Sequence, residues 1–163
     1  MVSILYREFY TELLQVGIPK IFDNYPLSSS ILGKGMGREV RIVKGLPLVC
    51  KIATNELGLL QNKTEFAIWQ KYMDKHLASV VYYDSQYLIM ERVQPLKFSS
   101  IYSTINEIID SPRISQLIAT LVEKHNLEHL DVLKTSSWGI SEEGIYKCFD
   151  YGLLVEHRSM AGR

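Results

Sequence analysis

Residues 32–40 read Leu-Gly-Lys-Gly-Met-Gly-Arg-Glu-Val, and this glycine-rich stretch decides how the rest of the chain is interpreted. Glycines let backbone N–H groups approach a phosphate without a Cβ in the way, so such loops can form anion-binding sites. A flexible turn is the plain structural alternative. The spacing is not the Walker pattern, and a strand follows the loop where a Rossmann fold would open a helix. These two nucleotide-binding folds are therefore excluded.

The segments after the loop have the patterns of an α+β protein. Residues 39–43 alternate between polar and apolar, and residues 48–52 are apolar and β-branched, so together they predict a β-hairpin. Residues 64–76 carry apolar side chains at helical spacing. Residues 79–83 and 87–90 are short apolar runs joined by a polar turn, which predicts a second hairpin.

The flanking segments predict further helices. Residues 3–15 have the spacing of an amphipathic helix, and two apolar stripes at helical spacing follow residue 93. The first stripe consists of Phe98, Ile101, Tyr102, Ile105, Ile108 and Ile109, and the second of Ile114, Leu117, Ile118, Leu121 and Val122. Residues 138–140 and 145–149 predict a third hairpin. We expect the stripes to be covered by the helix of residues 3–15 or by a second copy in a homodimer, since large apolar patches are rarely left bare.

Composition limits the class of protein. The 163 residues are enough for one domain, and 18 basic residues balance 18 acidic residues, so nucleic-acid binding driven by charge is excluded. No apolar run is long enough to predict a membrane span or a signal peptide. Cys50 and Cys148 belong to no C-x-x-C motif, so we expect two reduced thiols in a cytoplasmic protein.

The glycine loop and the hairpins together resemble the protein-kinase-like family, whose loop pattern is G-x-G-x-x-G-x-V. Gly33 and Gly35 match the first two glycines, and Val40 matches the valine. Arg38 stands where the third glycine belongs, with Gly37 one place early. The resemblance covers nearly the whole chain.

The resemblance implies a nucleotide site in the first half of the chain. Residues 48–51, Leu-Val-Cys-Lys, resemble the V-A-I-K strand, so Lys51 would bind the α and β phosphates of ATP and pair with Glu65. Residues 87–93 resemble the fifth strand and the hinge, so Met90 would border the adenine. The implied nucleotide contacts are Gly33, Gly35, Gly37, Val40, Val49, Lys51, Met90, Glu91 and Val93.

Two further motifs imply the catalytic and metal residues. His129-Leu130-Asp131 resembles H-R-D, which would make Asp131 the group that orients or deprotonates the acceptor hydroxyl. Residues 150–152, Asp-Tyr-Gly, resemble D-F-G, so Asp150 would bind Mg²⁺. The family's metal-binding asparagine is missing. Ser136 stands five places after Asp131, and Ser137 precedes Trp138-Gly139 where related sequences have the asparagine, so the implied metal ligands are Asp150 and Ser137.

The resemblance implies a single kinase-like domain over residues 1–163, of the α+β class. Residues 1–93 would form the N-terminal lobe, with a small antiparallel sheet, one helix and an extra N-terminal helix. Residues 94–163 would form a truncated, mainly helical C-terminal lobe, with the seam at Gln94-Pro95. Because the sequence ends soon after Gly152, we expect a minimal or truncated kinase, similar to those of phages and other mobile elements.

Each match has an ordinary alternative when taken singly. Lys51 could be an exposed strand lysine, Glu65 a solvated helix charge and Asp150 a turn residue. The matches occur in the family's order and on the expected elements, which favours the resemblance.

Two functions stay open. The first is an ATP- and Mg²⁺-dependent phosphotransferase similar to Ser/Thr protein kinases, which we favour because Lys51, Glu65, Asp131 and Asp150 are all present. The second is a catalytically degenerate pseudokinase that binds or inhibits a host protein, which Arg38 in the loop and Ser137 in place of asparagine favour.

Overall fold

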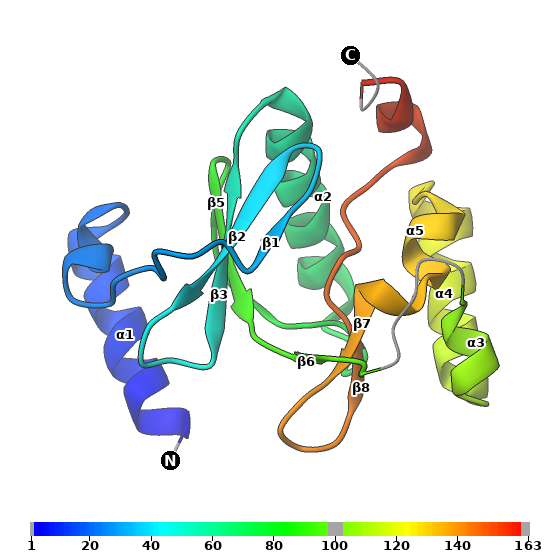
Figure 1. The fold of residues 1–163 in the computed structure, drawn as a ribbon, viewed down its shortest axis with the longest axis horizontal. Helices are drawn as coiled ribbons and strands as arrows, with labels where there is room; N and C mark the ends of the chain where they lie inside the picture. Colours follow the sequence, from blue (N-terminus) through cyan, green and yellow to red (C-terminus); the bar gives the residue numbers. More distant parts are fainter. Residues whose placement is uncertain (1, 98–102, 161–163) are drawn as a thin grey trace.

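The computed structural model describes residues 2–97 and 103–160, and the side chains of the first helix from residue 6 onward. The structure is α+β, with a five-stranded antiparallel sheet, a three-stranded sheet and several helices (Figure 1). The strands are β1 (Gly33–Lys34), β2 (Arg38–Val43), β3 (Leu48–Ala53), β4 (Val80–Asp84), β5 (Tyr87–Glu91), β6 (Gln94–Pro95), β7 (Trp138–Ile140) and β8 (Tyr146–Cys148). The α-helices are α1 (Val2–Val16), α2 (Glu56–Tyr72), α3 (Ile105–Ile108), α4 (Pro112–His125) and α5 (His129–Leu133). Short 3-10 helices are η1 (Lys20–Asp23), η2 (Thr135–Ser137) and η3 (Val155–Met160).

The large sheet confirms the first two predicted hairpins and has the strand order β1-β2-β3-β5-β4. Lys51 in the middle strand β3 lies opposite Val40 of β2 and Leu88 of β5. Since side chains alternate between the two faces of a strand, Lys51 shares a face with Val49, and Leu48 and Cys50 occupy the other face. The register therefore places Lys51 on the face of the sheet that also carries Val40, Val49 and Leu88.

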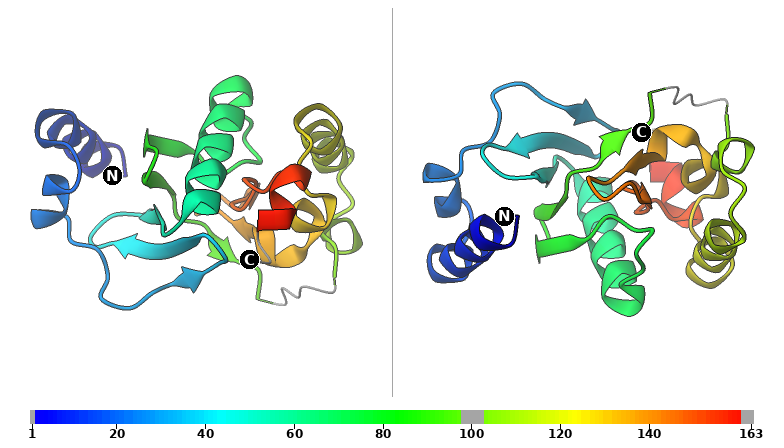
Figure 2. Two further views of the ribbon diagram at one scale, coloured as in Figure 1. Left: turned by 90° about the horizontal axis from the view of Figure 1, so that it is seen from above. Right: turned by 90° about the horizontal axis from the view of Figure 1, so that it is seen from below.

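Helix α1 covers the face of the sheet opposite Lys51. Its Phe9 and Leu13 are buried in one apolar cluster, together with Ile21, Val43, Leu46, Leu48, Cys50 and Ile89. The helix ends at Gly17, which has a φ of 70°. Both views of Figure 2 show α1 at the opposite end of the molecule from α3, α4 and α5. The expectation that this helix covers the apolar stripes after residue 93 is therefore wrong.

The second apolar stripe is covered by the chain itself. Ile114, Leu117, Ile118 and Leu121 of α4 are buried in the larger apolar cluster. That cluster also contains Ile68, Leu77, Leu88, Met90, Leu127, Val132, Trp138 and Tyr151. Helix α4 thus shares a buried cluster with residues that follow it in the sequence and with Leu88 and Met90 of the large sheet.

Helix α2 begins earlier and ends earlier than the predicted residues 64–76. Its N-cap is Asn55, whose side chain accepts a hydrogen bond from the Gly58 N–H, and its last turn stops at Met73 with a φ of 41°. The sequence analysis missed the first turns of the helix because Gly58 and the polar residues before residue 64 interrupt the apolar pattern. Gly58 is needed there because a Cβ on it would lie 1.9 Å from the carbonyl oxygen of Gly37.

The stripe of residues 98–109 corresponds to a much shorter helix. Phe98, Ile101 and Tyr102 lie outside the described residues, and α3 spans only Ile105–Ile108. A capping box formed by Thr104 and Glu107 begins this helix. Ile105 is fully buried, whereas Ile108 is half exposed.

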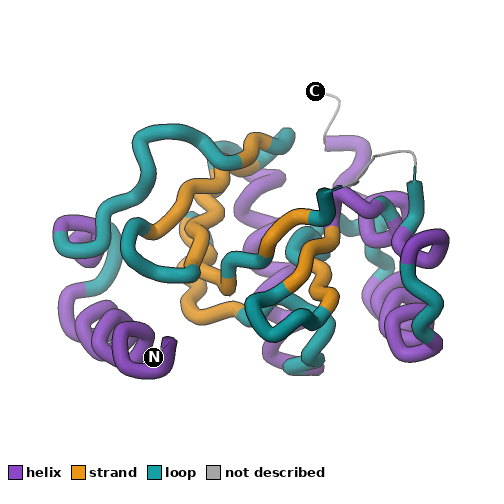
Figure 3. Tube along the Cα trace, turned by 60° about the horizontal axis from the view of Figure 1, so that its bottom comes forward, coloured by secondary structure: helices purple, strands orange, loops and turns teal. Residues whose placement is uncertain are grey.

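The predicted seam at Gln94-Pro95 is a short strand, β6, that pairs with β7. The third predicted hairpin is confirmed as β7 and β8, and it forms a small sheet with β6. Figure 3 shows the strands of both sheets in the middle of the molecule, with helices at both ends. Cys50 and Cys148 are buried free thiols, as expected. No helix of the described residues is both long enough and apolar enough to cross a membrane.

Candidate functional site

The site is built around an ion pair between Lys51 of β3 and Glu65 of α2. The Lys51 Nζ lies 2.9 Å from Oε1 and 2.8 Å from Oε2 of Glu65. Lys51 also donates to the carbonyl oxygen of Phe149. Both side chains are buried. The structure therefore brings together the two residues that the resemblance paired, and it joins them to the segment that precedes Asp150.

The segment of residues 150–152 packs directly against Glu65. The Tyr151 N–H donates to Glu65 Oε1 at 3.1 Å, and the Tyr151 hydroxyl donates to the Ala78 carbonyl at 2.9 Å. A Cβ on Gly152 would lie 2.6 Å from the Gln61 carbonyl oxygen. A buried tyrosine needs a partner for its hydroxyl, and Ala78 supplies one. Specific contacts thus explain why a tyrosine stands at position 151 and a glycine at position 152.

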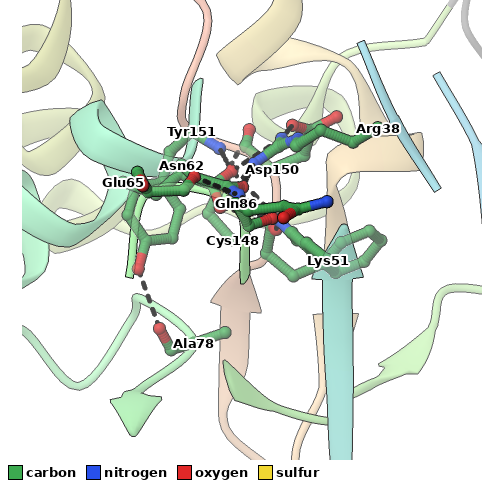
Figure 4. A network of polar contacts seen from close by, with 11 residues as sticks. Arg38, Lys51, Asn62, Glu65, Ala78, Gln86, Cys148, Asp150 and Tyr151 are labelled. Carbon is green, nitrogen blue, oxygen red and sulfur yellow. Dashed lines mark hydrogen bonds and ion pairs between the residues drawn. The ribbon is translucent and has the colours of Figure 1, made fainter. Parts of the chain in front are cut away.

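Arg38 is the residue of the site that the sequence did not predict. Its guanidinium is buried and forms ion pairs with Glu65 (Nη1 to Oε2, 3.0 Å) and Asp150 (Nη2 to Oδ1, 3.1 Å). Arg38 Nη1 also donates to Asn62 Oδ1 at 3.2 Å. Figure 4 shows the guanidinium between Asp150 and Glu65. The available signal was the strand alternation, because Arg38 stands two residues before Val40 and therefore on the same face as Lys51.

Burial and neighbouring charges set the protonation of this cluster. Burial lowers the pKa of Lys51 below its ordinary value, and the charge of Arg38 lowers it further, against the opposing effect of Glu65. Burial raises the pKa of Asp150, but the charges of Lys51, Arg38 and Lys134 outweigh it and bring that pKa below its usual range. Asp150 therefore stays ionised.

Asp131 lies in α5, within electrostatic reach of Asp150. Its carboxylate forms an ion pair with Lys134, and 22% of the Asp131 side chain is exposed. Burial and the charge of Asp150 raise the pKa of Asp131 above its ordinary value. Although burial lowers the pKa of Lys134, the hydrogen bond and charge of Asp131 and the charge of Asp150 raise it overall. A carboxylate with a raised pKa is a stronger base, which suits proton transfer.

Ser136 and Ser137 have different surroundings. Ser137, the serine predicted to bind metal, is fully buried, and its hydroxyl donates to the Asp131 carbonyl at 2.7 Å. Ser136 instead lines the cavity next to Lys51. The structure therefore brings Ser136, not Ser137, to the site.

An apolar cavity of about 260 Å³ opens beside Lys51, and its wall is formed by strands of the large sheet and by the C-terminal half of the chain. The residues that line it are Leu32, Gly33, Val40, Val49, Lys51, Met90, Glu91, Arg92, Val93, Pro95, Ser136 and Phe149. All the predicted nucleotide contacts lie in this wall except Gly35 and Gly37. The sequence analysis assigned no nucleotide contact to Leu32, Pro95, Ser136 and Phe149, because none of them matches a binding position of the motifs.

The three loop glycines do not have one common role. A Cβ on Gly37 would lie 2.5 Å from the Gly58 nitrogen, so Gly37 is required for contact between the loop and the start of α2. Gly35 has no atom within 4 Å of the place where a Cβ would stand. Asn55 also ties the loop to α2, because its side-chain amide donates to the Met36 carbonyl at 2.9 Å. The loop is thus held against α2.

Glu91 at the end of β5 forms an ion pair with Lys147. Lys147 of β8 donates to Glu91 Oε1 at 2.9 Å and to Oε2 at 2.7 Å. The Ser79 N–H also donates to Glu91 Oε2 at 3.1 Å. These contacts direct the Glu91 carboxylate toward Lys147 of the small sheet.

No family model matches the chain, and no curated protein matches it.

Proposed function

We propose that the chain is an ATP-dependent phosphotransferase of the protein-kinase-like kind that acts on a hydroxyl group of a protein. The observation that carries the proposal is the Lys51–Glu65 ion pair at the wall of an apolar cavity, with Asp150 bonded into the same cluster. The pair joins the middle strand of the sheet to α2, as in the arrangement that the sequence resembles. Lys51, Glu65 and Asp150, three residues of one motif set, thus meet at one place, which supports the two-lobed fold, with residues 1–93 and 94–163 as its lobes.

The cavity suits a planar apolar base. Its volume of about 260 Å³ is just below the range of roughly 300–1,000 Å³ for small-molecule pockets. Val40, Val49 and Met90 provide apolar walls, and Lys51 lies at the charged side. In the proposal the adenine lies against these apolar side chains, with the phosphates directed toward Lys51. In the proposal Asp131 and Lys134, which interact electrostatically with Asp150, lie on the side of the acceptor.

In the proposed reaction Asp131 accepts the proton of the acceptor hydroxyl. The hydroxyl oxygen forms a bond to the γ-phosphorus of ATP, the bond from that phosphorus to the bridging oxygen breaks, and ADP leaves with the electron pair. Phosphoryl transfer depends mainly on positioning and charge stabilisation, which Lys51 and Lys134 supply. Of the expected Mg²⁺ ligands, Asp150 has one oxygen paired with Arg38 and Ser137 donates its hydroxyl to a backbone carbonyl, so the two side chains do not form a pair of metal ligands. No step of the proposal uses the metal.

The test is the transfer of labelled γ-phosphate from ATP, first to the protein itself and then to a cell extract, with and without Mg²⁺. The wild type should transfer phosphate, and Asp131→Asn should abolish the transfer. Asp110→Asn replaces an exposed aspartate between α3 and α4, so it should leave the transfer unchanged. An inactive wild type, or an active Asp131→Asn, would contradict the proposal.

The second candidate is a pseudokinase that docks on or inhibits a host protein in the cytoplasm. The pairing of Arg38 with Asp150 favours it, because a carboxylate held by a guanidinium has fewer lone pairs for chemistry. In this case no phosphate is transferred, and a protein partner is captured equally well by the wild type and by Asp131→Asn.

A further inference from the structure

The guanidinium of Arg38 bridges the two carboxylates of the candidate site. Its Nη2 donates both to Glu65 Oε1 and to Asp150 Oδ1, each at 3.1 Å. Its Nη1 lies 3.0 Å from Glu65 Oε2. A single cation thus connects α2 to the segment after β8. This is the structural role that a bound cation would have between two acidic side chains.

The position of Arg38 is determined by neighbours that have no other role in the site. Asn62 of α2 is fully buried, and its amide group donates to the carbonyls of Ser85 and Gln86 at 3.2 and 3.1 Å. Because both donors of the amide are used, its oxygen must point the other way, toward Arg38 Nη1. Gly37, the residue before Arg38, is packed against Gly58. The guanidinium is therefore oriented before any ligand arrives.

The donor set does not fit Mg²⁺. Mg²⁺ requires near-octahedral oxygen ligation, usually with one or two carboxylates. Glu65 accepts hydrogen bonds from Lys51, Arg38 and the Tyr151 N–H, and Asp150 is paired with Arg38. Ser137 turns its hydroxyl to a carbonyl. Within residues 2–97 and 103–160, no group of three or more His, Cys, Asp or Glu side chains could hold a metal ion.

The charges of the cluster already balance. Three cations, Arg38, Lys51 and Lys134, face three carboxylates, Glu65, Asp131 and Asp150, and every one of these groups is in an ion pair with another of them. Although burial lowers the pKa of Arg38, Glu65 and Asp150 raise it overall, and arginine remains charged in proteins in any case. A divalent ion at Asp150 would therefore add charge to a cluster that is neutral overall. It would also lie next to the permanent positive charge of Arg38.

We propose that Arg38 takes the place of the divalent ion at Asp150, so that the chain binds a nucleoside triphosphate without Mg²⁺. The inference rests on the proposed function, because it concerns the cation that accompanies the nucleotide in that cavity. A guanidinium suits this task, since it pairs with carboxylates and phosphates through a planar set of donors.

The test is calorimetric titration of ATP into the wild-type protein, in EDTA and in Mg²⁺. The two dissociation constants should agree within about threefold, because the cluster supplies its own cation. Arg38→Gln should weaken ATP binding in EDTA by about tenfold or more, and Mg²⁺ should restore much of it, since two carboxylates have lost their counter-ion. Arg38→Lys keeps the charge and should stay independent of Mg²⁺. Arg41→Gln, on the same strand but outside the cluster, should bind like the wild type.

A second readout needs no nucleotide. Mg²⁺ alone should leave the melting temperature of the wild type unchanged and should raise that of Arg38→Gln, because only the variant has unpaired carboxylates to bind it.

ATP binding by the wild type that requires Mg²⁺, or that Mg²⁺ strengthens by more than about tenfold, would overturn the inference and leave the proposed function standing. Absence of ATP binding under both conditions would overturn the inference and the proposed function together. The wild-type titrations decide the matter even if Arg38→Gln fails to fold.

Discussion

Arg38, Lys51 and Glu65 carry the same kinds of charge as Asp131 and Lys134, but the two groups differ in burial. The side chains of the first group are 7%, 5% and 0% exposed, whereas those of Asp131 and Lys134 are 22% and 27% exposed. A buried charge must be paired, since desolvation otherwise destabilises the fold. The buried group therefore stabilises the fold in addition to any role in binding, and the partly exposed pair of Asp131 and Lys134 is the one that a substrate can reach.

This difference predicts the largest effect at Glu65, the acceptor for both buried cations. Glu65→Ala leaves Arg38 without one of its partners and Lys51 without its carboxylate, so the free energy of unfolding should fall by about 3–5 kcal/mol. Urea denaturation measures it. Glu123→Ala, at an exposed position of α4, is the control and should change stability by less than about 0.5 kcal/mol. A small loss at Glu65 would mean that the buried cations find other partners.

The next effect tests how the loop that carries Arg38 is supported. A Cβ on Gly58 would overlap the carbonyl oxygen of Gly37, so Gly58→Ala should reduce the free energy of unfolding by about 1–3 kcal/mol even though alanine favours a helix. Gly35→Ala, where nothing lies within 4 Å, should stay within about 0.5 kcal/mol of the wild type. Equal effects of the two substitutions in chemical denaturation would show that the loop does not pack on α2.

Tyr151 joins the buried group to the end of the chain and gives a smaller effect. Tyr151→Phe removes the hydroxyl that donates to the Ala78 carbonyl in the interior, so the free energy of unfolding should fall by about 1 kcal/mol. Tyr10→Phe, at an exposed position of α1, should leave stability unchanged and serves as the control. A Tyr151→Phe protein as stable as the wild type would show that the hydroxyl contributes no net stability.

The smallest effect has the opposite sign and concerns the exposed group. Burial and Asp150 raise the pKa of Asp131, so the folded protein binds this proton more tightly than the unfolded chain does. Stability from this group is present at low pH and is lost as the pH rises through the raised pKa. Asp131→Asn avoids that loss, so it should melt slightly higher than the wild type at neutral pH, with the difference disappearing in acid.

Thermal melts across the pH range measure this difference. A variant that melts lower than the wild type at neutral pH would mean that the ion pair with Lys134 outweighs burial and Asp150. Asp110→Asn, at an exposed position, is the matched control and should follow the wild type at every pH.

The sequence predicted most of the elements because periodicity reports local structure. The three hairpins and the helices α1 and α4 are where alternation and helical spacing placed them. Helix α2 was misjudged at its start because Gly58 serves a contact with Gly37, twenty-one residues away, and not helix propensity. The position of α1 was also wrong, because amphipathic spacing shows that a face is buried but not which surface covers it.

The candidate site was predictable where motif residues interact with one another. Lys51 and Glu65 pair as the resemblance implied. The sequence analysis treated Arg38 only as a substitution for the third glycine of the loop. A motif gives the residue that usually occupies a position, and it does not show which groups a different side chain at that position can contact. Its partners, Asn62 and Asp150, come from distant parts of the chain, so only the folded structure brings them together.

The measurement that tests the central claim most directly is a crystal structure of the protein with a non-hydrolysable ATP analogue. The account predicts the base in the cavity between Val49 and Met90, the phosphates within hydrogen-bond distance of Lys51, and Arg38 still paired with Asp150. An analogue bound elsewhere, or a metal ion at Asp150 with Arg38 turned away from it, would contradict the account.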